Sequence, residues 1–271
     1  MIELNKIYCE NCLDTMARAP DGFVQLTVTS PPYDDMRDYN GYKFEFEKIA
    51  QELFRVTQIG GTVVWVVADK TENFCESLSS SKQKIFFVEQ CGFNILDTMI
   101  YKKNGNPSQF PGMMRYQSAF EYMMILCKEK PLTFNKIRDR KNLYAGKKIT
   151  SATYRKKNGT LQDVRNSPTI SNFGDRNNVW EYDVGFLKST PDEVAYEHPG
   201  IFPENLARDH IYSWSNKGDL VYDPFMGSGT TAKMCILMDR NYIGSEISKE
   251  YCELAEKRIR PYRMQTKLDL G

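Results

Sequence analysis

Apolar residues along this chain follow two alternating patterns, and their order predicts an α/β fold. Short runs rich in β-branched residues indicate buried strands, whereas apolar residues spaced three and four apart indicate amphipathic helices. The expected strands are 6–8, 24–28, 62–68, 94–102, 118–127, 220–222 and 241–246. The expected helices are 12–19, 44–56 (ended by the pair Gly60-Gly61), 82–90, 203–213, 230–238 and 248–258. Strands that alternate with helices favour a mostly parallel sheet with helices on both faces.

The regular pattern fades between residues 130 and 176 and returns after them. We therefore expect one fold built from two parts, 1–129 and 177–271, with the segment 130–176 inserted between them. A length of 271 residues is enough for a full α/β core with such an insertion. A composition of 41% hydrophobic and 26% charged residues excludes a disordered chain.

Charge is distributed unevenly along the chain. The whole chain has a formal net charge of +1, which by itself would argue against a strongly cationic nucleic-acid binder. The segment 130–176, however, holds 12 basic and three acidic residues, so it carries +9 and the remainder carries −8. Aromatic residues lie among these bases, a combination typical of phosphate contact and base recognition. A solvated basic insertion is the alternative. The residues expected to contact nucleic acid are Lys147, Lys148, Arg155, Lys156 and Lys157.

Several classes of protein are disfavoured by what the sequence lacks. The first ten residues have no apolar core of signal-peptide length, and the longest apolar runs, 63–68 and 122–127, are too short to span a membrane. Seven scattered cysteines are typical of reduced thiols, and we expect a cytoplasmic protein. Cys9 and Cys12 form a C-x-x-C pair, but no second pair or histidine cluster accompanies them, so we expect no metal site.

A glycine-rich segment between the expected strand 220–222 and the expected helix 230–238 indicates a ligand. Gly227 and Gly229 allow a tight turn and a close approach to the backbone. Thr230 begins the helix, where hydroxyls and amides suit an anionic group. Glu246 ends the next strand, where a carboxylate can accept from ribose hydroxyls. A nucleoside-containing cofactor is therefore expected. The spacing Gly-x-Gly-x-x-Ala also fits a dinucleotide fingerprint, and a turn without any ligand is the structural alternative.

The second candidate segment, Thr29-Ser30-Pro31-Pro32-Tyr33, directly follows the expected strand 24–28. Ligands of open α/β sheets bind at the carboxyl ends of strands. Two consecutive prolines donate no backbone hydrogen bond, so the loop is rich in acceptors. The Ser30 hydroxyl and the Pro31 carbonyl therefore suit an –NH2 group, and Tyr33 offers a flat face for stacking. A stiff surface turn is the structural alternative.

Together these two segments resemble the motifs of the β-class amino-group DNA methyltransferases, which use S-adenosylmethionine. The Ser-Pro-Pro-Tyr loop comes first and the Asp-Pro-Phe-x-Gly-Ser-Gly-Thr-Thr turn last, as in that class, and the resemblance covers roughly residues 7–259. It implies a Rossmann-like, mostly parallel sheet in the circularly permuted methyltransferase order. It also implies that 1–129 and 177–271 form the catalytic domain and that 130–176 recognises the target.

The resemblance further implies roles for individual residues. Those expected to hold the target amine and base are Ser30, Pro31, Pro32 and Tyr33. Those expected to bind the cofactor are Asn11, Cys12, Phe202, Pro203, Asp223, Phe225, Gly227, Ser228, Gly229, Thr230 and Glu246. Within this set, Thr230 would lie near the methionine carboxylate and Glu246 would accept from the ribose.

The expected reaction is direct methyl transfer to an exocyclic amine of a base flipped out of double-stranded DNA. The sequence contains no Pro-Cys dipeptide, the signature of the cysteine nucleophile in cytosine-C5 enzymes. The resemblance implies N4 of cytosine as the preferred target, because serine at the position of Ser30 is commoner among the family's N4-cytosine enzymes, and N6 of adenine is the alternative. A nicotinamide-dependent oxidoreductase built on the glycine turn, and a DNA-binding module without catalysis, are the competing functions. The resemblance also brings in two partners that the residues do not specify, a second copy of the chain and a separately encoded restriction endonuclease.

Overall fold

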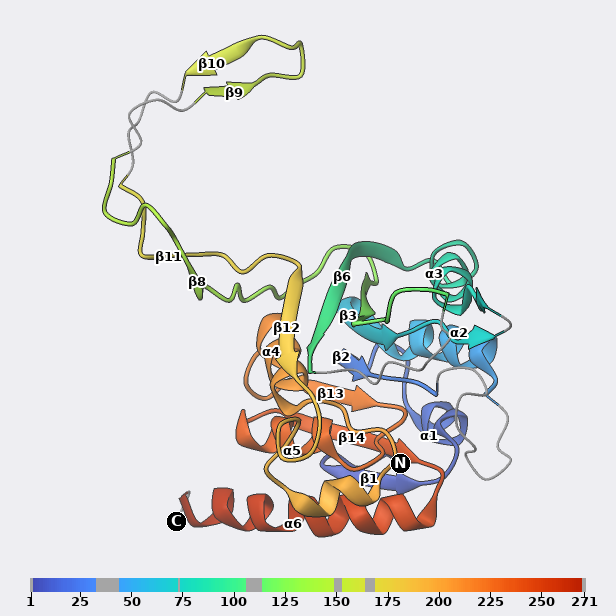
Figure 1. Ribbon diagram of the computed structural model, residues 1–271. Coiled ribbons are helices and arrows are strands. Elements are labelled where there is room, and N and C mark those ends of the chain that lie inside the picture. The colour runs from blue at the N-terminus through green and yellow to red at the C-terminus, as the bar shows by residue number, and fades with distance from the viewer. Residues whose placement is uncertain are drawn as a thin grey trace. The chain divides into compact units, whose positions relative to one another are not determined.

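A sheet of eight strands organises the larger of the two units into which the chain divides (Figure 1). The computed structural model describes residues 2–32, 44–72, 74–105, 114–148, 153–163 and 169–269, and every structural statement below concerns these. The larger unit comprises Met1–Asn135 and Asn178–Gly271, and the smaller unit is Lys136–Asn177.

The sheet of the larger unit is mostly parallel, as the alternation of elements predicts. Its strands are β1 (Lys6–Cys9), β2 (Val24–Thr29), β3 (Thr57–Val67), β6 (Asn94–Asn104), β7 (Phe120–Cys127), β12 (Val179–Asp183), β13 (Leu220–Asp223) and β14 (Asn241–Glu246). Their spatial order is β1-β14-β13-β2-β3-β7-β6-β12. Only β7 runs antiparallel to its neighbours β3 and β6 among these described strands. The carboxyl ends of β1, β14, β13, β2 and β3 therefore lie at one edge of the sheet.

Helices cover both faces of this sheet. They are α1 (Cys12–Arg18), α2 (Phe46–Val56), α3 (Ser79–Glu89), α4 (Glu204–Trp214), α5 (Thr230–Leu237) and α6 (Lys249–Asp269), with the 3-10 helix η1 (Glu193–Glu197). The helix α2 contacts both α1 and α3, and these helices share a hydrophobic core with alternating residues of the strands, among them Val63 and Trp65. The helices α4, α5 and α6 form a second series. A small hairpin of β4 (Thr71–Glu72) and β5 (Cys75–Glu76) completes the unit.

Three details differ from the sequence-based prediction. Gly60-Gly61 does not end a helix: α2 ends at Val56, and the glycines lie inside β3. Gly60 has φ +76, and a Cβ there would lie 2.4 Å from Leu132 Cγ, so the irregular register beside β2 requires glycine. The strand β12 and the 3-10 helix were not predicted. The last helix continues through Pro261 to Asp269 instead of ending at Arg258.

The smaller unit consists of two short antiparallel ladders. One joins β8 (Arg140–Lys141) to β11 (Phe173–Gly174), and the other joins β9 (Thr153–Arg155) to β10 (Leu161–Asp163). A turn at Asn158-Gly159 connects the second pair, with Gly159 at φ +83. The helices within the described residues are all too short or too polar to cross a membrane.

Candidate functional site

The two candidate loops lie side by side because β2 and β13 are parallel neighbours. Thr29 is the last residue of β2, and Asp223 is the last residue of β13. Thr29 Oγ1 donates to Asp223 Oδ1 at 2.7 Å. Thr231 Oγ1 donates to Asp223 Oδ2 at 2.7 Å, and the Phe225 amide donates to Oδ1 at 3.0 Å. One carboxylate therefore ties the strand before Ser30 to both ends of the glycine turn.

Burial removes Asp223 from water, and this desolvation disfavours its ionised form. Its side chain is buried, and burial raises the pKa of its carboxyl, while the hydrogen bonds from Thr29, Thr231 and the Phe225 amide act in the opposite direction. The three donors are all neutral, and their hydrogen bonds offset part of the free-energy cost of burying the carboxylate. This arrangement suits a group that organises the loops rather than one that reacts.

The glycine turn adopts a conformation that requires glycine at two positions. Gly227 has φ +51 and Gly229 has φ +81, both in the left-handed region. A Cβ at Gly227 would lie 3.1 Å from His198 Nε2, and a Cβ at Gly229 would lie 3.1 Å from Ala255 Cβ. The turn is therefore packed closely between His198 on one side and α6 on the other.

Glu246 ends β14 beside this turn. Its Oε2 accepts from the Gly227 amide at 2.8 Å, and its Oε1 accepts from the Ser248 amide at 2.9 Å. Burial raises the pKa of Glu246, against the lowering effect of those two amides. Each carboxylate oxygen has a further lone pair, so the side chain can accept hydrogen bonds from an added pair of hydroxyls.

Asn11 and Cys12 follow β1, which pairs with β14 so that Cys9 lies opposite Glu246. Asn11 caps α1, since its side-chain oxygen accepts from the Leu13 amide at 2.9 Å. Cys12 is buried, and burial raises the pKa of its thiol to about 12, so the thiol is neutral. Both residues therefore reach the same edge of the sheet as Glu246, and each also has a structural task there.

The apolar residues expected at the cofactor site come from two separate segments of the chain. The ring of Phe225 packs edge-on against Phe44 and Trp65, with centroids 5.8 and 6.1 Å away. Phe202 and Pro203 precede α4, where Pro203 is the buried N-cap residue. Phe225 thus connects the turn to the aromatic core under α2 and α3.

The loop after β2 is described in part. Pro31 is buried, and Ser30 and Pro32 are half-buried. Tyr33, the expected stacking residue, lies outside the described residues. The position of Ser30 immediately after Thr29 brings it to the edge that also carries Asp223 and the glycine turn.

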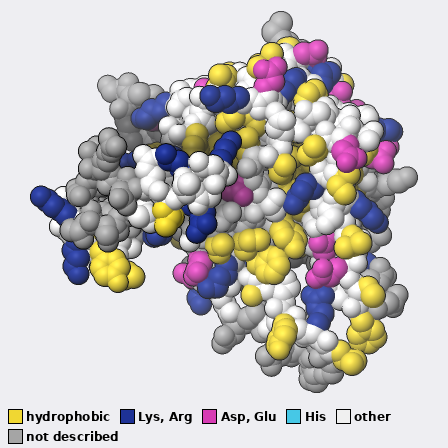
Figure 2. Space-filling model, turned by 90° about the horizontal axis from the view of Figure 1, so that it is seen from above, with side chains coloured by type: hydrophobic (Ala, Val, Ile, Leu, Met, Phe, Trp, Pro, Cys, Tyr) yellow, Lys and Arg dark blue, Asp and Glu magenta, His cyan; other side chains and the backbone are white. Residues whose placement is uncertain are grey.

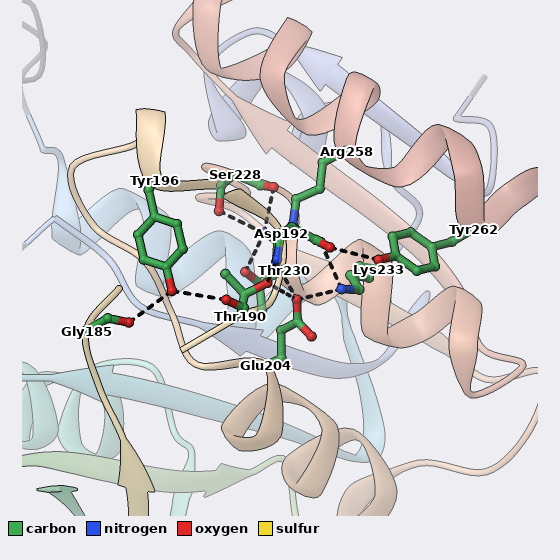
Figure 3. A network of polar contacts seen from close by, with 10 residues as sticks. All are labelled: Gly185, Thr190, Asp192, Tyr196, Glu204, Ser228, Thr230, Lys233, Arg258 and Tyr262. Atoms are coloured by element: carbon green, nitrogen blue, oxygen red, sulfur yellow. Dashed lines mark hydrogen bonds and ion pairs between the residues drawn. The ribbon is translucent and has the colours of Figure 1, made fainter. Parts of the chain in front are cut away.

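Sequence reasoning named Ser228 and Thr230 but missed the cluster of buried and half-buried polar residues to which they belong, which we call the Arg258 cluster (Figure 3). Its members are Thr190, Asp192, Glu204, Ser228, Thr230, Lys233, Arg258 and Tyr262. The side chains of Arg258 and Lys233 are 0% and 3% exposed, and both donate to Asp192 and Glu204. The sequence held one signal: Arg258 lies four and three residues after Leu254 and Ala255, so it occupies an apolar-face position of its helix.

In the smaller unit, acidic side chains pair with only some of the basic ones. Asp175 binds Lys136 and Arg138, and Asp139 binds Arg176. All five residues expected to contact DNA are exposed, and none forms an ion pair with a carboxylate among the described residues. Figure 2 shows exposed Lys and Arg side chains in dark blue. All five predicted positions, Lys147, Lys148, Arg155, Lys156 and Lys157, therefore carry charge without a carboxylate partner among the described residues.

Comparison with known proteins gives a consistent result. Residues 24–257 match the model of the N6/N4 methyltransferase family, described as DNA methylase. The orphan methyltransferase M.BamHII of Bacillus amyloliquefaciens is 55% identical over 243 residues, which cover 89% of this chain and 91% of that protein.

Solved structures agree with the fold. The complex of M1.HpyAVI with S-adenosylmethionine has a TM-score of 0.60 at 25% identity, covering 93% of this chain and 98% of that one. PvuII DNA methyltransferase, described as cytosine-N4-specific, has a TM-score of 0.66 at 18% identity, covering 93% and 85%. The Rossmann-like fold expected from the sequence is therefore confirmed, and a nicotinamide-dependent oxidoreductase is not favoured. The chain belongs to the N6/N4 family of DNA methylases, and it is a DNA methyltransferase that uses S-adenosylmethionine.

Proposed function

We propose that this enzyme methylates the exocyclic amine of a base flipped out of double-stranded DNA, with N4 of cytosine as the preferred target. The observation that carries the proposal is the bridge Thr29–Asp223–Thr231, whose two hydrogen bonds are both 2.7 Å. It joins the strand that precedes Ser30 to the helix that follows the glycine turn. An amine acceptor and a cofactor turn held by one buried carboxylate suit transfer between two bound groups.

The residues of the turn fit the cofactor. Gly227 and Gly229 have left-handed backbone conformations in which a Cβ would crowd a neighbour at 3.1 Å, and Glu246 retains acceptor capacity for ribose hydroxyls. Ser228 and Thr230 provide hydroxyls next to them for the carboxylate end. S-adenosylmethionine supplies, when bound, a methyl group activated on a sulfonium sulfur.

The chemistry of the chain itself concerns the target amine. An exocyclic amine is a poor nucleophile because its lone pair is delocalised into the ring. The Ser30 hydroxyl and the Pro31 carbonyl are proposed to accept its two hydrogens, which favours a tetrahedral nitrogen with a free lone pair. Flipping the base costs about a few kcal/mol, and stacking on Tyr33 is proposed to offset about 1–3 kcal/mol of that cost.

The choice of N4-cytosine over N6-adenine rests on Ser30. Within the family that the motifs resemble, serine at this position is commoner among N4-cytosine enzymes, and aspartate or asparagine among N6-adenine enzymes. A hydroxyl can accept from either amine, so N6-adenine methylation is the alternative.

The smaller unit is proposed to hold the DNA as the target-recognition segment. Lys147, Lys148, Arg155, Lys156 and Lys157 are exposed and lack carboxylate partners among the described residues, so their charge is available to phosphates. Contacts of this kind position DNA without specifying sequence.

Three expectations about context stay predictions. They are a homodimer, a separately encoded endonuclease and a cytoplasmic location. The name of the Bacillus amyloliquefaciens relative, an orphan methyltransferase, gives no support to the endonuclease.

Substitution of Ser30 tests the proposal. Ser30→Ala is expected to reduce transfer of a radiolabelled methyl group to DNA by about 10-fold or more. The reason is that the reacting amine loses the Ser30 hydroxyl as a hydrogen-bond acceptor. Cofactor affinity, measured by calorimetry, is expected to stay within about twofold. Ser81→Ala, an exposed position on α3, is the matched control. Normal turnover of Ser30→Ala would contradict the assignment.

A further inference from the structure

The guanidinium of Arg258 reaches the glycine turn from α6. Its Nη1 donates to Ser228 O, Ser228 Oγ and Thr230 Oγ1, each at 3.0 Å. Its Nη2 donates to Thr190 Oγ1 at 3.1 Å and to Glu204 Oε1 at 2.6 Å, and its Nε donates to Asp192 Oδ2 at 2.8 Å. Figure 3 shows this side chain pointing into the centre of the cluster. One planar group therefore fixes both hydroxyls of the turn.

These bonds set the polarity of the two hydroxyls. Arginine is always a donor, so Ser228 Oγ and Thr230 Oγ1 must act as acceptors toward it. A hydroxyl that accepts still has one hydrogen to donate. Within the described residues neither hydroxyl donates that hydrogen to a protein acceptor. Both side chains are thus left as donors beside Gly227 and Gly229.

The charge of Arg258 is already neutralised, so it does not attract an anion directly. Arg258 and Lys233 face Asp192 and Glu204, and Tyr262 donates to Asp192 Oδ1 at 2.9 Å. Burial opposes ionisation of Asp192, but hydrogen bonds from Arg258, Lys233 and Tyr262 outweigh it and lower its pKa. The cluster holds two cations and two carboxylates in balance. Its effect on a ligand must therefore act through the residues that Arg258 holds.

We propose that Arg258 is a positioning residue for cofactor binding, which orients the Ser228 and Thr230 hydroxyls as donors to the carboxylate of S-adenosylmethionine. The inference rests on the proposed role of the glycine turn. It extends that site to Arg258 of α6 and explains why the Arg258 side chain is buried. Lysine cannot replace it, because an ammonium lacks the planar fork that reaches both hydroxyls and both acids at once.

Two ligands separate positioning from general support of the fold. S-adenosylhomocysteine and 5′-methylthioadenosine both carry an uncharged thioether sulfur on adenosine, but only the first has the amino-acid end with its carboxylate and ammonium groups. Calorimetric Kd values for both are measured on the full chain. We expect each of three variants to raise the Kd for S-adenosylhomocysteine by about 10-fold or more. These variants are Thr230→Val, Ser228→Ala and Arg258→Lys. Binding of 5′-methylthioadenosine is expected to change less than about twofold.

A charge-balanced variant guards against loss of folding. Arg258→Met with Glu204→Gln removes one cation and one carboxylate together and leaves Lys233 paired with Asp192. Arg263→Gln is the control, because Arg263 lies on the same helix but contacts Glu256 and Tyr242 instead of the turn. It is expected to leave both Kd values unchanged.

The outcomes are distinct. An equal loss for both ligands in the Arg258 variants, or an unchanged ratio of the two Kd values in Thr230→Val, overturns the positioning role. If an Arg258 variant does not fold, as judged by thermal unfolding, Thr230→Val and Ser228→Ala decide the question. Failure of the wild-type chain to bind either ligand would instead contradict the proposed cofactor turn itself.

Discussion

Neutralising four lysines of the smaller unit should change how salt affects DNA binding. Lys147, Lys148, Lys156 and Lys157 are exposed and have no carboxylate partner among the described residues. Each phosphate contact contributes about 0.9 to the slope of log Kd against log salt. If all four contact phosphates, the fourfold glutamine variant loses about 3.6 from this slope. Between about 50 and 200 mM salt, the wild type should therefore lose about 150-fold more affinity than the variant.

The assay is fluorescence anisotropy with a labelled duplex across that salt range. In the charge-matched control, glutamine replaces four lysines of the larger unit whose side chains are exposed and paired with a carboxylate. These lysines are Lys6, Lys48, Lys217 and Lys249. Exposed pairs contribute about 0–1 kcal/mol each, so the control should fold normally and keep the wild-type slope. A slope that falls equally in both variants would mean that net charge alone governs binding. An unchanged slope in the first variant would refute the assignment of the smaller unit to DNA.

Three further substitutions test the turn and its supports. Gly229→Ala adds a Cβ 3.1 Å from Ala255 Cβ at φ +81 and should lower the unfolding free energy by about 2–4 kcal/mol in urea; Gly159→Ala, at φ +83 with open space around it, should show only the backbone share of about 1–2 kcal/mol. Burial raises the pKa of Glu246, so the stability that this group contributes below its ordinary pKa of 4.5 is lost as pH rises through the folded value, while cofactor affinity rises over the same interval. Calorimetry should show a smaller change of both quantities with pH in Glu246→Gln, where only the share of other groups such as Asp223 remains. Thr29→Val removes a donor to a buried carboxylate and should cost about 1–3 kcal/mol, with reduced methyl transfer, whereas a neutral result would show that the bridge is dispensable.

Local sequence signals were sufficient for much of the fold. The strand 241–246 was predicted with its observed bounds, and β2 and β13 each extend one residue further than expected. These segments are apolar, short and bounded by turn residues, so local pattern and tertiary burial agree. The turn itself was also predictable, because two glycines between a strand and a helix favour the left-handed backbone that Gly227 and Gly229 adopt.

Long-range packing explains what the sequence could not reveal. Gly60-Gly61 is a usual helix-ending pair, but Leu132, 72 residues after Gly60, packs where its Cβ would be and makes it part of β3. The Arg258 cluster assembles residues from α4, α5, α6 and the segment before η1, so no local window contains it. The single trace was a charged residue on the apolar face of α6.

The measurement closest to the central claim is mass spectrometry of nucleosides from DNA treated with the enzyme and S-adenosylmethionine. DNA from unmethylated cells is incubated, digested to nucleosides and compared with a reaction that contains Ser30→Ala. The account predicts N4-methylcytosine with the wild type and about 10-fold less or none with the variant. Detection of N6-methyladenine instead would show that the target is N6 of adenine and not N4 of cytosine. A methyl group on a ring carbon, or no methylated nucleoside at all, would contradict methyl transfer to an exocyclic amine.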